Sequence, residues 1–551
     1  PIWTPAIDKI GQANMTHFIN SVRRDYSSDI NNYSSLYHWS INKPREFWPA
    51  VWHYCNIKTS KEWDEVLIND NDMLKTSWFN DCRFNFAENL LCRRDEHPAL
   101  IFRSEKGKRR EISYQKLYQL VAQTAHALRN DGVRSGDRIV GYLPNMPESV
   151  IIMLATTSIG ATWSSCSPDF GTRGVMDRFS QIKPKILFSV DGYFYNGKWI
   201  DLMEKNQQLS IQLSTVEKII MIPFTKNLPD CSRLNNAVIF NDYISNQDKT
   251  SIKFEQLPFD HPLYILYSSG TTGVPKCIVH GAGGTLIQHL KELVLHTDLK
   301  PDDRLFFFTT CGWMMWNWLV SGLATGATVV LYDGSPFYPG PETLFDIAEQ
   351  EDITIFGAGA KYFSAIEKAG VKPIKTHSLG KLKSILSTGS PLPPKSFDYI
   401  YRDIKNNIHL ASISGGTDII SCFALGNPTQ PVYRGELQCR GLGMKVEVFN
   451  ENGESVQARV FRVAQRRKDV RGSRRQLPGI PVKLPDTGRR QDRHHRHGEY
   501  QRREPRPVWS EGLRDRRAGD QGGDKKPRRR QDAQSRAAQV HRYVRRLPLG
   551  W

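Results

Sequence analysis

Paired cysteines are missing from this 551-residue sequence. Its nine cysteines are scattered, and none of them belongs to a CxxC pair. Scattered cysteines fit reduced thiols in a reducing compartment better than a disulfide framework or a zinc site. The cysteine pattern therefore predicts a cytosolic protein.

Long apolar runs are missing as well. The most apolar stretch, residues 149–163, is interrupted by Ser, Thr and Gly before it reaches membrane-spanning length. The first ten residues have neither the basic flank nor the apolar core of a targeting signal. We expect no segment that spans or targets a membrane. Because the sequence starts at Pro1 rather than Met, we also expect a trimmed or partial chain.

An excess of charge is missing from most of the chain, although the formal net charge is +18. Residues 1–455 hold 47 basic and 47 acidic residues, whereas residues 456–551 hold 24 Arg and 4 Lys against 10 acidic residues. The neutral main body gives no sign of nucleic-acid binding. Only the Arg-rich final segment has the charge to bind RNA or DNA through phosphates.

The main body alternates short apolar strands with helical periods, which predicts an α/β fold built from βα units. We expect two Rossmann-like βα subdomains in series. The first contains strands at 99–103, 137–143 and 185–190, and helices at 114–132 and 147–160. The second contains strands at 263–267, 304–310, 327–332, 353–358, 382–389 and 408–415, and helices at 284–296 and 342–350.

The texture of the sequence changes twice near its end. Residues 441–455 alternate in polarity up to an Asn452-Gly453 turn, which predicts a β-hairpin that opens a smaller β subdomain. Beyond residue 457 no period persists, and Val, Leu, Ile and Phe make up only 15 of the last 96 residues. Such a segment buries too little apolar area to offset the entropy of ordering. We therefore expect it to be disordered.

A run of small and hydroxyl residues, Ser268–Gly273, directly follows an apolar strand in "YILYSSGTTGVPKCIVH". The run does not fit the GxxxxGK[ST] phosphate loop, because Pro275 and Cys277 stand where that motif needs Gly and Ser or Thr. A strand before it, a helix from about Gly284 after it, and the charge of Lys276 nevertheless favour phosphate binding. The alternative is a mobile surface loop.

Three other stretches follow predicted strands, where open α/β sheets bind their ligands. They are "FTTCGWMMWNW" at 308–318, "LSTGSPLPP" at 386–394 and "SISGGTDII" at 412–420. Most aromatics and methionines of the first stretch are expected in the core. The third stretch combines two glycines with a hydroxyl and a carboxylate, which suits close approach to a ligand and a metal.

These motifs resemble the adenylate-forming superfamily of acyl-CoA synthetases. "YSSGTTGVPK" is similar to the phosphate loop of the superfamily, and Thr417-Asp418 is similar to its Thr-Glu motif. "REFWPAVWHYC", "FNFAENLL", "WSSCSPDFG", "DGYFYNGK" and "SGGTDI" are similar to the acetoacetyl-CoA synthetase family in particular. The resemblance covers roughly residues 1–457 and stops there.

The resemblance implies a ligase that activates acetoacetate with ATP as an acyl-adenylate and transfers the acyl group to CoA, with Mg²⁺ as cofactor. Catalytic roles are implied for Lys276, Thr417 and Asp418, with Thr417 at the α-phosphate and Asp418 as the metal ligand. The phosphates would be held by Ser268, Ser269, Gly270, Thr271, Thr272, Gly273 and Lys276. The rest of the nucleotide would be held by Gly389, Ser390, Pro391, Gly415, Gly416 and Thr417.

The resemblance also implies an acyl pocket walled by Trp313, Met314, Met315, Thr388 and Gly415. Acetyl-CoA synthetases, which the N-terminal third also resembles, have Trp at the position of Gly415. Its loss is expected to open space for a four-carbon keto acid. Asp418 in place of Glu shortens the metal ligand by one methylene.

The resemblance divides the chain at three points. It implies an N-terminal extension at 1–92 of the acetyl-CoA synthetase type, an AMP-binding domain at 93–432, the start of a β subdomain at 433–457, and a tail at 458–551 outside the family. The family's ribose Asp, hinge Arg and C-terminal Lys have no counterpart after Gln457, so we expect impaired activity. The tail is either the product of an altered reading frame or splice, or a basic arm for nucleic acid.

Two rival functions remain open at this stage. One is a ligase for another short-chain acid. The other is a non-catalytic nucleotide-binding remnant with a basic nucleic-acid-binding tail. The sequence does not fix the oligomeric state.

Overall fold

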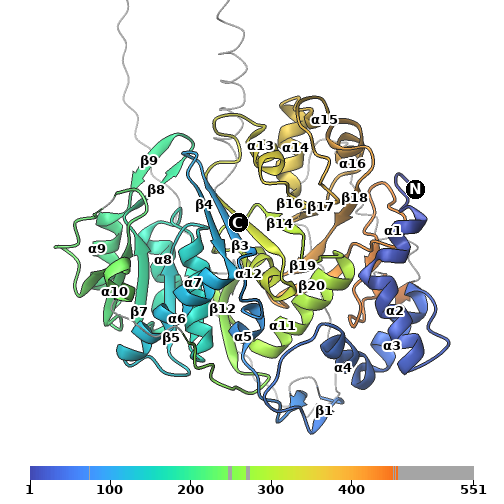
Figure 1. Cartoon of the computed structure of the whole chain (residues 1–551), viewed down its shortest axis with the longest axis horizontal. Helices are drawn as coiled ribbons and strands as arrows, with labels where there is room; N and C mark the ends of the chain where they lie inside the picture. Colours follow the sequence, from blue (N-terminus) through green and yellow to red (C-terminus); the bar gives the residue numbers. More distant parts are fainter. Residues whose placement is uncertain are drawn as a thin grey trace, which may run out of the picture. The chain divides into compact units, whose positions relative to one another are not determined.

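The structure, a computed structural model, describes residues 1–72, 75–226, 228–245, 251–268, 273–450, 452 and 454–456 (Figure 1). The tail predicted at 458–551 lies outside the described residues, as do Ser269–Thr272 of the predicted phosphate loop. Within the described residues, no helix is long and apolar enough to cross a membrane. The cytosolic location stays a prediction.

One large sheet of the described chain carries the first predicted subdomain. Its strands run parallel except for the antiparallel pair β12–β13 at one edge. Inner strands such as Ile186–Val190 and Thr162–Cys166 are buried along their whole length, as expected for a parallel sheet covered on both faces. The strand order is β11 (Ala237–Ile239), β10 (Lys218–Ile222), β7 (Ile186–Val190), β5 (Arg138–Tyr142), β6 (Thr162–Cys166), β12 (Pro262–Ser268) and β13 (Lys276–Gly281).

A second large sheet carries the other predicted subdomain. It is also parallel except for an antiparallel edge pair, β3–β4. The α/β class is therefore confirmed. The strand order is β18 (His409–Ser412), β17 (Ser384–Thr388), β16 (Ile355–Gly359), β14 (Arg304–Phe307), β15 (Thr328–Asp333), β3 (Pro98–Ser104) and β4 (Arg109–Ser113).

The expectation that the sheets follow each other in series is wrong for two hairpins. Strand β3 pairs with β15 through Leu100 and Val329, so the first strand of the early half belongs to the second sheet. Strand β12 pairs with β6 through Tyr264 and Trp163, so the first strand of the later half belongs to the first sheet. Strand pairing depends on distant partners, which local periodicity does not identify.

Helices connect and cover the strands, and their starts follow local rules. The Ser113 side chain accepts a hydrogen bond from the Lys116 amide and caps α6, and Pro147 opens α7 at the first helical position. The helices between residues 86 and 404 are α5 (Phe86–Leu90), α6 (Tyr114–Asn130), α7 (Pro147–Ser158), α8 (Thr172–Ile182), α9 (Met203–Gln212), α10 (Phe240–Ser245), α11 (Ala282–Leu290), η1 (Lys291–His296), α12 (Met314–Val320), η2 (Ser321–Thr325), α13 (Thr343–Gln350), α14 (Ala360–Lys368), α15 (Pro373–Thr376), α16 (Pro394–Tyr399) and η3 (Ile400–Ile404).

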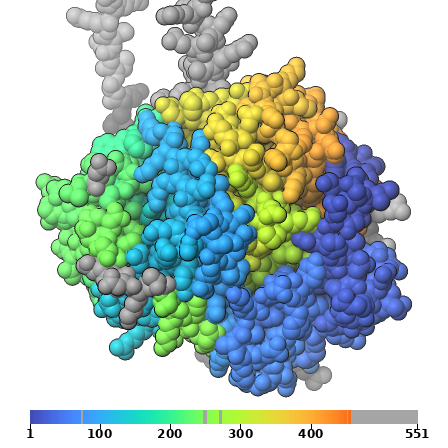
Figure 2. Space-filling view, in the orientation of Figure 1, coloured from blue at the N-terminus to red at the C-terminus, as the bar shows by residue number. Residues whose placement is uncertain are grey.

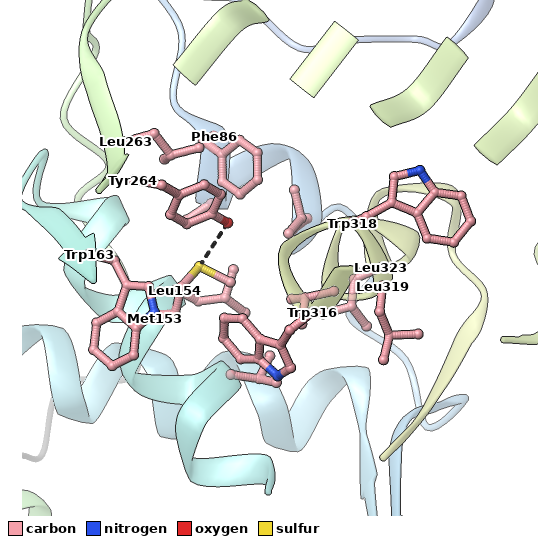
Figure 3. Packing of buried hydrophobic residues seen from close by; sticks show 14 of the residues in the cluster. Phe86, Met153, Leu154, Trp163, Leu263, Tyr264, Trp316, Trp318, Leu319 and Leu323 are labelled. Atoms are coloured by element: carbon pink, nitrogen blue, oxygen red, sulfur yellow. Dashed lines mark hydrogen bonds between the residues drawn. The ribbon is translucent and has the colours of Figure 1, made fainter. Parts of the chain in front are cut away.

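The main hydrophobic core joins the two sheets. In Figure 3, Trp163 of β6, Tyr264 of β12 and Met153 of α7 lie near Trp316 of α12, a helix that follows a strand of the other sheet. The Tyr264 hydroxyl lies 3.4 Å from the Met153 sulfur, and the Trp316 indole donates to Asn145 at 3.0 Å. These contacts fix α12 against the first sheet.

The N-terminal region packs against later parts of the chain. It contains α1 (Ile7–Gln12), α2 (Asn14–Asp25), α3 (Tyr33–Asn42), α4 (Pro44–Tyr54), β1 (Glu65–Ile68) and β2 (Ser77–Asn80). In Figure 2 its blue surface lies beside the yellow-green and orange residues. The Asn14 amide donates to Asp298 at 2.7 Å, and the Tyr37 hydroxyl donates to the Met444 carbonyl at 2.9 Å. The region therefore holds η1 and the segment near residue 440 in place.

Short strands complete the described chain. The predicted hairpin near the end is confirmed, because Val448 pairs with Val456 and Phe449 with Ser455. Gly453 of its predicted turn lies outside the described residues. The remaining strands are β8 (Gly192–Tyr195) with β9 (Lys198–Asp201), β19 (Ser414–Gly416) with β20 (Ser421–Leu425) and β21 (Cys439–Arg440), and β22 (Val448–Phe449) with β23 (Ser455–Val456).

Candidate active site

The predicted site stretches follow the carboxyl ends of parallel strands, as expected. They come directly after β14, β17 and β18 of the second sheet, and the predicted phosphate loop follows β12 of the first sheet. The two sheets meet at these ends. The Ser165 hydroxyl donates to the Cys311 carbonyl at 2.7 Å, and the Cys311 thiol donates to the Pro144 carbonyl at 3.2 Å. The site therefore lies where the ends of both sheets converge.

The predicted phosphate loop has a different local context from the one expected. It connects the antiparallel strands β12 and β13, with Ser268 paired to Lys276, and α11 begins only after β13. The predicted strand before the loop and the predicted helix near Gly284 are both observed, but a short strand that was not predicted, β13, lies between the loop and the helix. The Gln181 side chain of α8 donates to the Pro275 carbonyl at 2.9 Å and ties the loop to the first sheet. Gly273 has a φ of +144°, which L side chains rarely adopt.

Strand β13 connects this loop with the Thr-Asp motif. Residues two apart on a strand share a face, so Lys276 and His280 project to the same side of β13. His280 is 7% exposed, and its Nε2 has no hydrogen-bond partner within the described residues. Burial lowers the pKa of His280, while a backbone hydrogen bond to Thr417 and the charge of Asp418 act in the opposite direction. His280 thus contacts the motif from the strand that starts with Lys276.

The Thr-Asp motif forms the turn between β19 and β20. The Ile420 amide donates to the Thr417 carbonyl at 3.3 Å and closes the turn. Ile420 has a φ of +46°, a left-handed conformation that is unfavourable for a β-branched residue and that concentrates at functional sites. Thr417 is half-buried and Asp418 is exposed, so both side chains are accessible to a ligand.

The two neighbouring glycines of this motif have different surroundings. A Cβ on Gly415 would lie 2.2 Å from the Ser421 carbonyl oxygen, which is far inside van der Waals contact. A Cβ on Gly416 would meet no atom of the described residues within 4 Å. Glycine at 415 is thus required by the close approach of β19 and β20. Its role as a wall of the acyl pocket stays a prediction.

The residues predicted for adenosine and for the acyl group come from adjoining loops. Gly389 has a φ of +82°, and a Cβ there would lie 3.6 Å from the Trp313 ring. Trp313 is half-buried, whereas Met314 and Met315 are almost wholly buried in α12. The Thr388 hydroxyl donates to the Ile413 carbonyl at 2.9 Å. Among the predicted walls that have a side chain beyond hydrogen, Trp313 is therefore the most accessible to a ligand.

Ser390 and Pro391 follow Gly389 in the same loop. Ser390 is half-buried and Pro391 is exposed. Ser268 ends β12 and is half-buried. Their contacts with a nucleotide stay predictions.

Asp418 is the residue predicted to hold a metal ion. The described residues contain no group of three His, Cys, Asp or Glu side chains arranged to bind a metal. Mg²⁺ is commonly held by one or two carboxylates together with substrate phosphates and water. An exposed carboxylate beside the predicted phosphate site fits that mode of binding.

A large cavity lies elsewhere in the described chain. Its volume is about 1080 Å³, and it lies between the N-terminal region and α11, with Trp48, Trp78 and Gln288 among its lining residues. Its charged residues are paired, with Arg45 to Asp70 at 2.9 Å and Lys43 to Glu46 at 3.8 Å. None of the predicted site residues that the structure describes lines this cavity. We place the candidate site at the sheet ends, because the glycine-rich turn and accessible polar groups gather there.

Three site-adjacent residues were absent from the sequence prediction: His280, His289 and Glu292. The prediction placed no strand between the loop and the helix from about Gly284, and the four-residue spacing of Lys276 and His280 on one strand face therefore went unnoticed. His289 and Glu292 lie on α11 and η1 and are wholly buried. The sequence signal that could have identified them is the presence of His289 and the adjacent Lys291-Glu292 pair within a largely apolar helix.

The sequence matches two known families. It matches the family described as AMP-binding enzyme over residues 87–460, and the acetyl-coenzyme A synthetase N-terminus over residues 33–90. It is 47% identical over 457 residues to the acetoacetyl-coenzyme A synthetase of Rhizobium meliloti (strain 1021), which covers 83% of this chain and 70% of the relative. The chain belongs to the acetoacetyl-CoA synthetase family.

Other members and relatives of the acetoacetyl-CoA synthetase family agree with this assignment. The acetoacetyl-CoA synthetase of Gallus gallus is 47% identical over 463 residues, covering 83% of this chain and 69% of the relative. The solved structure of the acetoacetyl-CoA synthetase from Streptomyces lividans matches with a TM-score of 0.78 and 41% identity, over 83% of this chain and 71% of that chain. Malonamoyl-CoA synthetase vrtB of Penicillium aethiopicum is 41% identical over 479 residues, covering 82% of this chain and 66% of the relative.

The family assignment fixes the class of enzyme. Acetoacetyl-CoA synthetases are AMP-forming acid–thiol ligases, and AMP-binding ligases of this kind use ATP and CoA. The predicted resemblance, the enzyme class and the α/β fold are thereby confirmed. The roles of the individual site residues and the domain boundaries stay predictions.

Proposed function

We propose that the protein activates acetoacetate with ATP and is built to transfer the acyl group to CoA. The observation that carries this proposal is that His280, which shares a face of β13 with Lys276, contacts the Thr417–Asp418 turn at the converging ends of both sheets. The identity to acetoacetyl-CoA synthetases over 83% of the chain supports acetoacetate as the acid.

The reaction requires two steps because a carboxylate is a poor acyl donor. In the first step, a carboxylate oxygen attacks the α-phosphate of ATP, an O–P bond forms, and pyrophosphate leaves. In the second step, the CoA thiol attacks the acyl carbon, loses its proton, and displaces AMP. The first step develops charge on phosphate oxygens, so positioning and neutralisation of those oxygens supply most of the catalysis.

The described residues divide this work. Lys276 would neutralise the β- and γ-phosphates, and the backbone amide of Gly273 would approach them closely. The Thr417 hydroxyl would donate to the α-phosphate. Asp418 would hold Mg²⁺, which supplies positive charge to the phosphate oxygens when it is bound.

The adenosine and the acyl group would lie on opposite faces of the same wall. Gly389–Pro391 would line the adenosine, and the accessible Trp313 ring beside Gly389 would close the acyl side. A hydrophobic wall discriminates one methylene by only about 1–3 kcal/mol, so acids of similar size should compete. The similarity to a malonamoyl-CoA synthetase favours a second candidate, a ligase for another short-chain acid.

The first experiment tests the phosphate site. Mg·ATP binding is measured by calorimetry for the 551-residue chain, for Lys276→Ala, and for Lys375→Ala, an exposed lysine on α15. Loss of a charge-assisted contact of about 1.5–3 kcal/mol predicts an affinity at least about tenfold weaker for Lys276→Ala. Lys375→Ala should bind like the parent. Equal affinity of all three proteins would exclude the phosphate role of Lys276.

The second experiment tests the acid. Pyrophosphate release is compared for acetoacetate, acetate and malonamate, in a chain joined to the C-terminal domain of a relative. Acetoacetate should give the highest kcat/KM. A higher value for malonamate would favour the second candidate.

A further inference from the structure

A buried carboxylate lies beneath the candidate site. Glu292 is 0% exposed and belongs to η1, a π-helical turn that continues α11. π-helical turns are rare in proteins overall, and those that occur are often found at functional sites. A buried carboxylate is stable only when donors satisfy its oxygens. The identity of those donors shows what the carboxylate connects.

The donors to Glu292 come from two different elements. From β20, the Cys422 amide donates to Oε1 at 3.0 Å, and the Ser421 hydroxyl donates to the same oxygen. From α12, the Trp318 indole donates to Oε2 at 3.0 Å. Figure 3 shows Trp318 and Trp316 leaving α12 in different directions, and the Trp318 indole donates to Glu292 whereas the Trp316 indole donates to Asn145. One carboxylate therefore joins α12 to β20.

Both of these elements carry predicted site residues. Ser421 follows directly on the turn that contains Thr417 and Asp418. Helix α12 begins immediately after Trp313, and its first two residues are Met314 and Met315. The position of Glu292 consequently fixes the spacing between the nucleotide motif and the acyl wall.

His289, one turn earlier, makes a parallel connection. Its Nε2 lies 2.9 Å from the Ile420 carbonyl, and its Nδ1 lies 2.8 Å from the Ser321 hydroxyl at the end of α12. A carbonyl only accepts, so Nε2 donates to Ile420. This bond holds the strained left-handed residue that closes the motif turn.

Lys291 compensates the charge of Glu292 inside the protein. Its ammonium lies 3.7 Å from Glu292 Oε1 and donates to Gln288 and to the Leu442 carbonyl at 2.8 and 3.1 Å. Lys291 contacts neither α12 nor the motif turn through these bonds. Lys291 thus compensates the charge of the Glu292 carboxylate. Among the described contacts of these two residues, only those of Glu292 connect α12 with β20.

We propose that Glu292 is a positioning residue that couples the acyl wall on α12 to the nucleotide motif on the β19–β20 turn. This inference rests on the proposed function and adds to it a means by which acyl and nucleotide binding reinforce each other. A ligand that spans both parts gains affinity only if the two walls are held at the correct separation.

The experiment compares two ligands in the 551-residue chain. One is AMP, and the other is the butyl ester of AMP, which joins a four-carbon chain to the α-phosphate. The Kd of AMP divided by the Kd of the butyl ester measures the affinity that the four-carbon arm adds. Glu292→Gln keeps the size of the side chain but replaces one acceptor oxygen with an amide group that cannot accept from Trp318 or Cys422. The ratio should fall by about tenfold, equivalent to about 1.4 kcal/mol.

A matched variant separates positioning from general stability. Leu293→Ala removes a wholly buried side chain from the same turn without touching the carboxylate. Partial unfolding weakens both ligands by the same factor and leaves the ratio unchanged, so Leu293→Ala should retain the parent ratio. If Glu292→Gln does not fold, Trp318→Phe and Ser421→Ala each remove one donor from one side and should lower the ratio in the same way.

The outcomes distinguish this inference from the proposed function. A parent chain that binds the butyl ester no better than AMP would overturn the proposed function. A parent chain that prefers the ester, with an unchanged ratio in Glu292→Gln or an equal fall in Leu293→Ala, would overturn the positioning role alone.

Discussion

Gly415 and Gly416 show at the residue scale how one motif can contain two different requirements. The sequence suggests that Gly415 enlarges the acyl pocket, because the acetyl-CoA synthetases that the chain resembles have Trp at this position. The structure adds a second reason, the 2.2 Å approach of the Ser421 carbonyl to the position of a Cβ. Strand pairing across a hairpin is not visible in the spacing of residues. A Trp at 415 would therefore move the hairpin backbone before it altered the acyl pocket.

We predict that Gly415→Ala weakens nucleotide binding, whereas Gly416→Ala does not. The added methyl group at 415 must displace the β20 backbone, and the motif turn that bears Thr417 would move with it. Overpacking of this kind typically costs about 1–3 kcal/mol in stability. Calorimetry with Mg·ATP and thermal unfolding check both variants. Equal affinity and equal Tm for Gly415→Ala and the parent would show that the hairpin accommodates a Cβ.

A second residue-scale prediction concerns the loop. Gly273→Val should weaken Mg·ATP binding because a φ of +144° is strained for a β-branched residue, although no atom of the described residues lies within 4 Å of its Cβ position. Gly284→Ala, which also has open space but no positive φ, serves as the control in the same calorimetry. A loss of affinity in Gly284→Ala as large as in Gly273→Val would contradict the explanation from backbone strain.

At the scale of elements, the helix formed by α11 and η1 contains two buried histidines. Burial lowers the pKa of His289 to about 4 and that of His296 to about 3. The ordinary pKa of about 6.5 applies when the chain is unfolded. The unfolded state therefore binds protons between about pH 6.5 and 4 while the folded state does not. The stabilisation is complete above pH 6.5 and is lost as the pH falls through this window.

We predict that the free energy of unfolding falls between pH 7 and pH 5, and that His289→Gln reduces this fall by about 2 kcal/mol. Burial raises the pKa of Asp333 to about 7, and this carboxyl changes stability in the opposite direction over the same range. The difference between variant and parent cancels that contribution. Urea unfolding at the two pH values measures it, and an identical pH dependence in both proteins would be inconsistent with a neutral buried His289.

Most individual elements could be predicted from the sequence, because their periods are local. The helix predicted at 114–132 is observed at Tyr114–Asn130, and the strand predicted at 185–190 at Ile186–Val190. Strand β13 was missed because it spans only Lys276–Gly281 and its residues do not alternate between polar and apolar. The connections made by Glu292 could not be predicted, since they join residues that are distant in sequence. Local chemistry thus located the site, and tertiary pairing determined how its parts are held.

At the scale of the whole molecule, the family match ends at residue 460. Our proposal is that the 551-residue chain binds nucleotide weakly and does not complete thioester synthesis. Residues after Gln457 offer no counterpart of the ribose Asp, the hinge Arg or the C-terminal Lys that the family resemblance implies. Loss of one oxyanion-type donor reduces rates by about 10²–10³-fold.

The measurement is acetoacetate-dependent CoA thioester formation by this chain beside a full-length relative. We predict a rate below one tenth of that of the relative, a difference in barrier of more than about 1.4 kcal/mol. Retained Mg·ATP binding in the same preparation would show that the body is folded. A rate within about tenfold of that of the relative would mean that residues 457–551 supply the missing groups.

The exchange of hairpins between the two sheets determines the order in which this chain can fold during synthesis. Leu100 must pair with Val329, so β3, the strand that contains Leu100, emerges from the ribosome long before its partner exists. At about 5–20 residues per second, the wait is on the order of ten seconds or more. Leu100, Ile101 and Phe102 are wholly buried in the folded protein, and throughout that time they lack the neighbouring strand β15. A chain interrupted before β15 would leave this apolar edge permanently unpaired, and such an edge is a template for aggregation.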